Sequence, residues 1–306
     1  MFMKLGNDVS VLVRGWLHGN CVALAGRGGP PALIDTGYHT GTARLLAWYE
    51  QTTGRPVADI EAIGLTHIHS DHAGGVAALA EVVEAPVLAH RDAAAQAEAW
   101  DPRALWLDGT SQEMPRFSVD RALDDDELVS LGGREWRILW TPGHAVGGVS
   151  WWCEEDGLLV TGDALWEDGF GLLNPWINGP EVFALTGLAL DRLDGVAGGA
   201  RAVIPGHGAP FEDAAAAIAR ARSRLDYLRR NPDRHRRQVL FNLAAYTTLV
   251  RPEIGREALF ARVRQAARSF VPSGGEQRRD DAICAEVLSA LYRDEVSEKV
   301  TSDENR

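Results

Sequence analysis

One stretch of the chain reads Thr66-His67-Ile68-His69-Ser70-Asp71-His72-Ala73-Gly74-Gly75. It places three imidazoles and a carboxylate within six residues, and these groups are donors that bind zinc, iron or manganese. Titratable groups so close together would repel or desolvate one another unless a cation compensated them. The apolar run at residues 60–65 predicts a buried strand, and the Gly-Gly pair predicts a turn. We therefore expect a set of metal ligands at the C-terminal end of a strand.

Three further ligand candidates stand in glycine turns that follow apolar strands. They are His144 after residues 135–141, Asp163 after residues 158–161, and His207 after residues 202–205. Glycine in such a turn lets the backbone bend sharply and leaves room for an ion. A single histidine after a strand is usually an ordinary loop residue. Together with the first cluster, however, these positions predict one metal centre.

The rest of the pattern alternates strands and helices in two halves. Strands are predicted over residues 9–13, 21–25, 32–35, 60–65, 86–89, 135–141, 149–153, 158–161 and 202–205. Helices are predicted over residues 41–53, 73–84, 184–194 and 212–230, whereas residues 91–123 show no clean period and are expected to be irregular. This order predicts an α/β fold in which two sheets pack face to face with helices outside.

The bulk composition suits a globular protein with one large domain and an appendage, or with two small domains. No apolar run approaches the ~20 residues of a membrane span, and the first residues lack the pattern of a secretory leader, so we expect a cytoplasmic protein. The cysteines Cys21, Cys153 and Cys284 match no metal spacing and are expected to be buried and reduced. The net charge of −12 argues against nucleic acid as a partner.

The motifs resemble those of the metallo-β-lactamase superfamily over roughly residues 9–225. The resemblance rests on His67-x-His69-x-Asp71-His72 followed by His144, Asp163 and His207. It implies an αβ/βα four-layer sandwich with two divalent metal ions along its open edge. One ion would be bound by His67, His69 and His144, and the other by Asp71, His72 and His207. Asp163 and a hydroxide would bridge them. Zinc is the expected metal, with iron or manganese as alternatives.

The resemblance also implies an activity. True β-lactamases of the superfamily lack an aspartate at the bridging position, so Asp163 points to the glyoxalase II, lactonase and phosphodiesterase branches. We expect a hydrolase that cleaves a carboxylic ester, a thioester or a lactone with a metal-bridging hydroxide. Asp71 would orient the nucleophile or pass a proton in addition to binding metal. Asp35 would hold a ligand imidazole through its second nitrogen, or it is only a turn-capping residue.

Aromatic residues in two loops are predicted to wall a pocket for a small-molecule substrate. These residues are Trp100, Trp106, Trp166, Phe170 and Trp176. Apolar walls with few polar groups suit an acyl chain, an aryl group or a lactone ring. The competing interpretation places several of these side chains in the hydrophobic core.

Residues 1–230 are expected to form the catalytic domain, and residues 231–306 a C-terminal helical segment with helices near 256–268 and 280–292. This segment would cap the pocket or mediate a homodimer. Its basic cluster, Arg234 to Arg237, would suit nucleic-acid binding by a winged-helix-like unit. We favour a solvated helix face or pairing with acidic neighbours, because base readout needs more than charge.

Three other functions compete with the hydrolase. A mononuclear iron persulfide dioxygenase would use two histidines and one aspartate from the same ligand set, and metal content would separate it from a hydrolase. Phosphodiester cleavage on RNA conflicts with the acidic net charge and with the absence of a long inserted nuclease domain in the sequence. A non-enzymatic sensor would be expected to have lost ligands, whereas the full set is present. Fold alone decides none of these.

Overall fold

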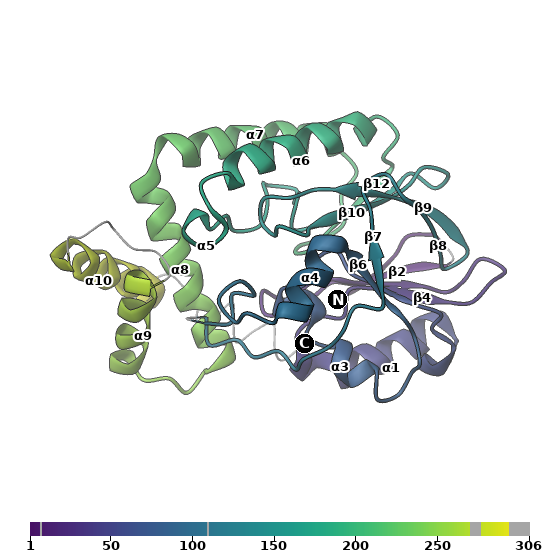
Figure 1. Ribbon diagram of the computed structural model, residues 1–306, viewed down its shortest axis with the longest axis horizontal. Helices are drawn as coiled ribbons and strands as arrows, with labels where there is room; N and C mark the ends of the chain where they lie inside the picture. The colour runs from purple at the N-terminus through teal and green to yellow at the C-terminus, as the bar shows by residue number, and fades with distance from the viewer. Residues whose placement is uncertain (7, 109, 270–276, 294–306) are drawn as a thin grey trace.

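The computed structural model describes residues 1–6, 8–108, 110–269 and 277–293. In these residues two sheets lie face to face, and helices cover both outer faces (Figure 1). Helices α1 and α3 lie below the first sheet in Figure 1, and α6 and α7 lie above the second. The predicted α/β four-layer sandwich is confirmed.

The first sheet has seven strands in sequence order, and its second half is parallel. The strands are β1 (Phe2–Lys4), β2 (Val9–Leu12), β3 (Cys21–Leu24), β4 (Ala32–Ile34), β5 (Ile63–Gly64), β6 (Val87–His90) and β7 (Arg121–Leu123). Pairing is antiparallel from β1 to β4 and parallel from β4 to β7. The parallel strands β4 and β5 therefore end at the same edge of the sheet.

The second sheet has five strands in the order β12-β11-β10-β9-β8. They are β8 (Leu128–Leu131), β9 (Arg134–Trp140), β10 (Val149–Cys153), β11 (Leu158–Gly162) and β12 (Ala202–Pro205). Only β11 and β12 pair in parallel. All five residues of β10 and of β11 are buried, as expected for strands covered on both faces.

Helices supply the outer layers and the C-terminal segment. They are α1 (Thr42–Thr53), α2 (Ser70–Ala73), α3 (Val76–Leu79), α4 (Arg91–Ala99), α5 (Pro175–Asn178), α6 (Val182–Ala197), α7 (Ala214–Arg230), α8 (Pro232–Val250), α9 (Arg256–Ser269) and α10 (Gln277–Arg293), with short 3₁₀ turns at His39–Gly41 and Val57–Asp59. One apolar cluster fills the space between the sheets, and two others lie under the outer helices.

Trp151 of β10 ties the two sheets together directly beneath the candidate site. Its indole lies against Gly64, where an added Cβ would come within 2.7 Å of the ring. Its Nε1 donates a hydrogen bond of 3.3 Å to the carbonyl oxygen of Leu65. The glycine at the end of β5 is therefore needed for the close approach of the sheets. This contact fixes the strand end from which the histidine cluster emerges.

Helices α8, α9 and α10 pack on one another through a fourth apolar cluster at one end of the sandwich (Figure 1). The described residues after 230 form helices and no strand, so the helical segment is present and a β-wing is not among them. Helix α7 ends at Arg230 and α8 begins at Pro232, and the division into a catalytic domain and a C-terminal segment at this point stays a prediction. Residues 270–276 and 294–306 of the expected segment lie outside the described residues. In the part that the structure describes, every helix is too short or too polar to span a lipid bilayer.

The basic cluster is only partly exposed, with Arg234 and Arg237 at the surface. His235 and Arg236 are buried, and His235 Nε2 donates a hydrogen bond of 2.9 Å to the carbonyl oxygen of Leu173. Arg237 pairs with Glu286 of α10 at 3.4 Å. The pair of Arg237 with Glu286 agrees with the favoured interpretation of a solvated face or pairing with acidic neighbours. The burial of His235 and Arg236 was not predicted, and the expectation that nucleic acid is not a partner stays a prediction.

Several predicted elements were wrong in detail. Residues 91–123 are not irregular throughout, because they contain α4 and β7. The helix expected over residues 73–84 is wrong: α2 ends at Ala73, and after the Gly74-Gly75 pair only the single turn α3 follows, over Val76–Leu79. Strands β1 and β8 were not predicted. Helix α4 was not predicted because its alanine-rich sequence lacks the apolar periodicity on which such predictions depend. The helix expected over residues 73–84 is interrupted at Gly74-Gly75 because glycine is unfavourable in a helix interior.

Candidate metal centre and pocket

The first ligand candidates stand where β5 ends and α2 begins. The chain leaves β5 through Thr66 and passes His67 and His69 before it enters α2, which carries Asp71 and His72. His69 is the N-cap residue of this short helix. All four candidate side chains are buried. The tight turn after an extended strand thus points several donors into one small volume.

The other ligand candidates come from the second sheet. His144 follows β9, and Asp163 and His207 follow the parallel strands β11 and β12. Backbone hydrogen bonds tie these loops together, since the amide of Gly206 donates to the carbonyl of Gly162 at 2.7 Å. The candidates of the two sheets therefore meet at one edge of the sandwich.

The structure brings every predicted ligand into one cluster. The cluster contains three overlapping groups whose ligand atoms lie within 4.8 Å of one another: His67, His69 and His144; Asp71, His72 and His207; and His67, His72 and Asp163. The third group shares a histidine with each of the other two. This overlap is the geometry expected for two neighbouring ions with a carboxylate between them.

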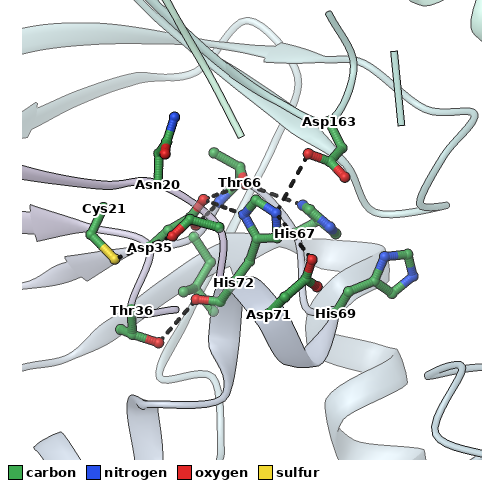
Figure 2. Close-up of polar contacts among 12 residues, drawn as sticks. Asn20, Cys21, Asp35, Thr36, Thr66, His67, His69, Asp71, His72 and Asp163 are labelled. Atoms are coloured by element: carbon green, nitrogen blue, oxygen red, sulfur yellow. Dashed lines mark hydrogen bonds and ion pairs between the residues drawn. The ribbon is translucent and has the colours of Figure 1, made fainter. Parts of the chain in front are cut away.

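Asp35 supports the cluster from the end of β4. Its carboxylate accepts hydrogen bonds from Thr66 N at 2.8 Å, Thr66 Oγ1 at 2.7 Å and His72 Nδ1 at 2.8 Å (Figure 2). Asp35 is 2% exposed and has a φ of 58°. A non-glycine residue in the left-handed region is strained and persists only where its surroundings hold it. Asp35 thus orients the His72 ring so that Nε2 faces the cluster.

Unpartnered buried atoms show that the cluster fits a metal. His67 Nε2 and His72 Nε2 are buried and have no hydrogen-bond partner, an arrangement that costs free energy unless something else binds them. His69 Nδ1 and His144 Nε2 face each other at 2.8 Å. Imidazole nitrogens and carboxylates are donors that suit zinc, iron and manganese. The residues present therefore fit two divalent ions.

The protonation states also suit metal binding. Burial lowers the pKa values of His67, His69 and His144, that of His69 to about 3, so these rings are neutral. Burial works against the ionisation of Asp163, but the facing imidazoles outweigh it and hold the pKa of its carboxyl well below its usual range. Neutral imidazoles and ionised carboxylates are the forms that bind metal.

His72 shows that the cluster attracts positive charge. Burial would lower the pKa of this ring, but Asp71, Asp163 and Asp35 outweigh it and raise the pKa well above its usual range. Burial also disfavours the charged form of Asp71, but His72 and His207 bring the pKa of its carboxyl to about 2. The carboxylates therefore draw a cation into the site, and divalent ions would supply that charge.

A cavity of about 450 Å³ adjoins the cluster. Its walls include the ligand candidates His69, Asp71, His144 and Asp163, the aromatic residues Trp16, Trp106, Trp166, Phe241 and Tyr246, and the leucines Leu172, Leu243 and Leu249. The ligand candidates make one side polar, and elsewhere the apolar side chains are interrupted by polar and charged residues, namely Thr110, Gln112, Asp168, Arg224, Gln238 and Asn242. A cavity of this size and lining suits a small organic molecule.

Two of the five predicted wall residues line this cavity. The ring of Trp106 lies 4.5 Å from that of His69, and Trp166 Nε1 donates to Asp163 Oδ1 at 3.1 Å. The prediction for the other three was wrong. Trp100 packs edge-on against Phe117 on the outer side of the first sheet, Phe170 is buried under α6 and α7, and Trp176 packs against His235. Each of these side chains packs in an apolar cluster, which removes apolar surface from water.

Several residues of the site were not predicted from the sequence, and Tyr246 and Trp16 are two of them. Tyr246 of α8 is a cavity wall, and its hydroxyl donates to Asp71 Oδ2 at 3.4 Å. Trp16, in the loop between β2 and β3, stacks on His207 with ring centroids 5.5 Å apart, although it is 56% exposed. No motif marks either residue, because each reaches the site only through tertiary packing.

A two-sheet sandwich with histidine and aspartate ligands at one edge defines a class of metal-binding proteins. The family model described as "Metallo-beta-lactamase superfamily" matches residues 14–232. The chain therefore belongs to the metallo-beta-lactamase superfamily, as the motifs indicated.

Individual relatives agree with this assignment. A hydroxyacylglutathione hydrolase from Idiomarina loihiensis is 32% identical over 149 residues, which cover 48% of this chain and 47% of the relative. The chain thus spans about half the length of the curated relatives it matches. A metallo-beta-lactamase family protein from Thermus thermophilus has a TM-score of 0.57 and 27% identity, covering 85% of this chain and 93% of that one. A metallo-beta-lactamase from Cronobacter sakazakii shares the fold over 98% of both chains, with a TM-score of 0.55 and 20% identity.

Proposed function

We propose that this protein is a hydrolase of carboxylic esters, thioesters or lactones that uses two divalent metal ions, with zinc as the expected metal. The observation that carries the proposal is the overlap of the three ligand groups. His67 and His72 each belong to one ion's set and also to the group that contains Asp163. A centre for a single ion would not need all these side chains in one buried cluster.

The bound ions would lower the pKa of a water molecule and polarise a carbonyl group. Residues of the chain would orient the metal ligands. Asp35 holds His72 in position through Nδ1, and Trp166 holds the Asp163 carboxylate through its indole N–H. Such supporting contacts set the orientation of ligands. Asp71 is ionised and accepts a hydrogen bond of 3.4 Å from the Tyr246 hydroxyl, so this pair places a negative charge and a hydroxyl group beside the cavity, where they could orient a water molecule.

The lining of the cavity favours an acyl substrate. Trp106, Trp166 and Leu172 offer apolar surface immediately beside the ligand candidates Asp163 and His144. Such walls exclude water and hold an acyl chain, an aryl group or a lactone ring. The names of the similar hydroxyacylglutathione hydrolases describe thioester cleavage, which supports the same reaction class here.

Metal analysis tests the proposal most directly. We expect about two zinc ions per chain in protein purified without added metal, together with turnover of at least one member of a panel of thioesters, lactones and aryl esters. Asp163→Ala should lose most of the metal and nearly all activity. Asp226→Ala, which alters an exposed ion pair with Arg230 on α7, is the matched control. Retention of metal and activity by Asp163→Ala would disprove the bridging role.

One set of results would favour the dioxygenase alternative over the hydrolase. The dioxygenase alternative requires one iron per chain, oxygen uptake with a persulfide substrate and no turnover of any ester.

Metal removal tests metal binding without any substrate. A chelator should lower the melting temperature and added zinc should restore it, because a ligand bound only by the folded state stabilises it by about 2.7 kcal/mol at a hundred times its Kd.

A further inference from the structure

Arg224 of α7 lines the cavity beside the candidate metal centre. Of the described residues that form the cavity wall, it is the only arginine or lysine. The cavity that it lines is largely apolar, with Trp166, Leu172 and Phe241 among its walls. A fixed positive charge in such surroundings is costly unless a negative charge balances it.

The protein is built to hold Arg224 in this place. The guanidinium lies over the ring of Phe170, with its carbon 5.1 Å from the ring centroid. Gly169 has a φ of 131°, and a Cβ at this position would come within 2.6 Å of Arg224 Nη1. The missing side chain at Gly169 therefore makes room for the guanidinium. The Phe170 ring and the space at Gly169 therefore hold the guanidinium in one position, as is typical of a residue that binds a ligand.

In the part of the chain that the structure describes, no acid pairs with this charge. Among the described residues, no carboxylate oxygen lies within 4.0 Å of the Arg224 guanidinium. Asp168, which also lines the cavity, pairs instead with Arg220 at 3.2 Å. Burial alone accounts for the lowered pKa of Arg224, with no opposing contribution from an acid. Arg222 of the same helix contrasts with it, since Arg222 pairs with Asp191 and Asp194.

We propose that Arg224 binds a carboxylate group of the substrate, so that the preferred substrates are acyl compounds with a single carboxylate at the end of an apolar chain. This inference rests on the proposed hydrolase function and names its substrate class. The reacting carbonyl would lie at the metal centre and the carboxylate at Arg224. The apolar wall between them would contact the connecting chain.

The charge of the cavity wall separates this substrate class from others. A thiol such as glutathione carries two carboxylates, whereas the described wall residues offer one cation. A phosphodiester of RNA would bring several negative charges to an acidic protein with a net charge of −12. One guanidinium matches one carboxylate through two parallel hydrogen bonds.

A pair of matched substrates tests the proposal. The first is the 4-nitrophenyl monoester of adipic acid, which carries a free carboxylate, and the second is its neutral ω-carboxamide counterpart. We expect the wild-type protein to prefer the acid. In Arg224→Met the ratio of kcat/KM for the acid to that for the amide should fall roughly 10- to 100-fold, the value of a hydrogen bond to a charged group. Arg222→Met, which removes an exposed arginine of the same helix, should keep the ratio.

Direct binding provides a readout that does not depend on turnover. Calorimetric titration with 4-phenylbutyrate should show weaker binding to Arg224→Met than to wild type, while 4-phenylbutyramide should bind the two alike. Arg224→Gln, which keeps a polar side chain of similar reach, replaces Arg224→Met if that variant fails to fold.

The results separate the substrate class from the hydrolase itself. If no ester is cleaved but 4-phenylbutyrate binding still depends on Arg224, the hydrolase proposal fails and the carboxylate site stands. If esters are cleaved without preference for the acid, and the Arg224 variants bind 4-phenylbutyrate as wild type does, the carboxylate site is wrong. An equal loss in Arg222→Met would also overturn it, since the effect would then belong to the charge of the helix.

Discussion

Replacing Asp35 by alanine should weaken both the fold and the metal centre. The carboxylate accepts three hydrogen bonds from two buried residues, Thr66 and His72. Without it, the Thr66 hydroxyl can still donate to His67 Nδ1, which lies 3.1 Å away. The Thr66 amide and His72 Nδ1 would lose their partners. An unpaired buried donor costs about 1–3 kcal/mol, so the free energy of unfolding should fall by roughly 2–6 kcal/mol.

Loss of the same contacts should lower metal affinity. His72 would no longer be held with Nε2 toward the cluster, and removal of such a support typically costs 10–100-fold in affinity. Stability is measured by urea unfolding in the presence of a chelator, so that metal does not contribute. Zinc affinity is measured by competition with a chromophoric chelator. Asp35→Asn, which keeps one acceptor oxygen and tolerates the left-handed backbone, should lie between wild type and Asp35→Ala.

The control is Asp59→Ala. Asp59 pairs with Arg55 at 3.1 Å, its side chain is 40% exposed, and it lies in the turn before β5. An exposed ion pair of this kind contributes at most about 1 kcal/mol, and zinc affinity should not change. If Asp35→Ala matched the control in both stability and affinity, the role given to Asp35 would be refuted.

Three further predictions concern other parts of the site. Gly206→Ala would place a Cβ 2.2 Å from Asp163 Oδ1 and should lower zinc content without unfolding the protein, whereas Gly187→Ala, in open space on α6, should raise the melting temperature slightly; equal zinc content in both would contradict the packing argument. Burial and the nearby Arg14 guanidinium lower the pKa of His18 to about 3, so the unfolded chain binds the extra proton and stability of the metal-free protein should fall as pH drops from about 6.5 to 3, by at most about 1.4 kcal/mol per pH unit from this residue. Urea unfolding of His18→Gln should show a shallower dependence in that window, and an identical dependence would show that His18 does not contribute. Tyr246→Phe removes one hydrogen bond to Asp71 and should lower kcat/KM roughly 3- to 10-fold with zinc content kept; an unaltered kcat/KM would exclude a role for the hydroxyl.

The fold and the ligand cluster were accessible from the sequence because both depend on short-range patterns. Each ligand candidate follows an apolar strand and stands next to a glycine or in the His-rich run. Parallel strands that end at one edge bring such positions together whatever the details of packing. Asp35 also stands at the end of a strand, and its hydrogen bond to His72 Nδ1 agrees with the supporting role that the family resemblance implied.

The residues of the cavity wall were harder to predict from the sequence. In an irregular segment, the sequence does not show which way an aromatic side chain points. Trp100 and Trp106 stand six positions apart, yet the first packs on the outer side of a sheet and the second beside His69. Arg224 and Tyr246 lie on helices where nothing in the local pattern distinguishes them from solvent-facing or core residues. Their positions follow from how α7 and α8 dock, which is a property of the whole chain.

The docking of α8 also separates two tasks within the molecule. The candidate metal ligands all lie in residues 67–207, whereas Gln238, Phe241, Asn242 and Tyr246 of the cavity wall come from one helix further along the chain. Substitutions on the cavity-facing side of α8 can therefore alter which molecules fit, with the metal centre left intact. A library restricted to this helix face would be the natural starting material for redirecting the protein to new substrates, and sequence drift in α8 is a route by which related chains could diverge in selectivity while keeping one chemistry.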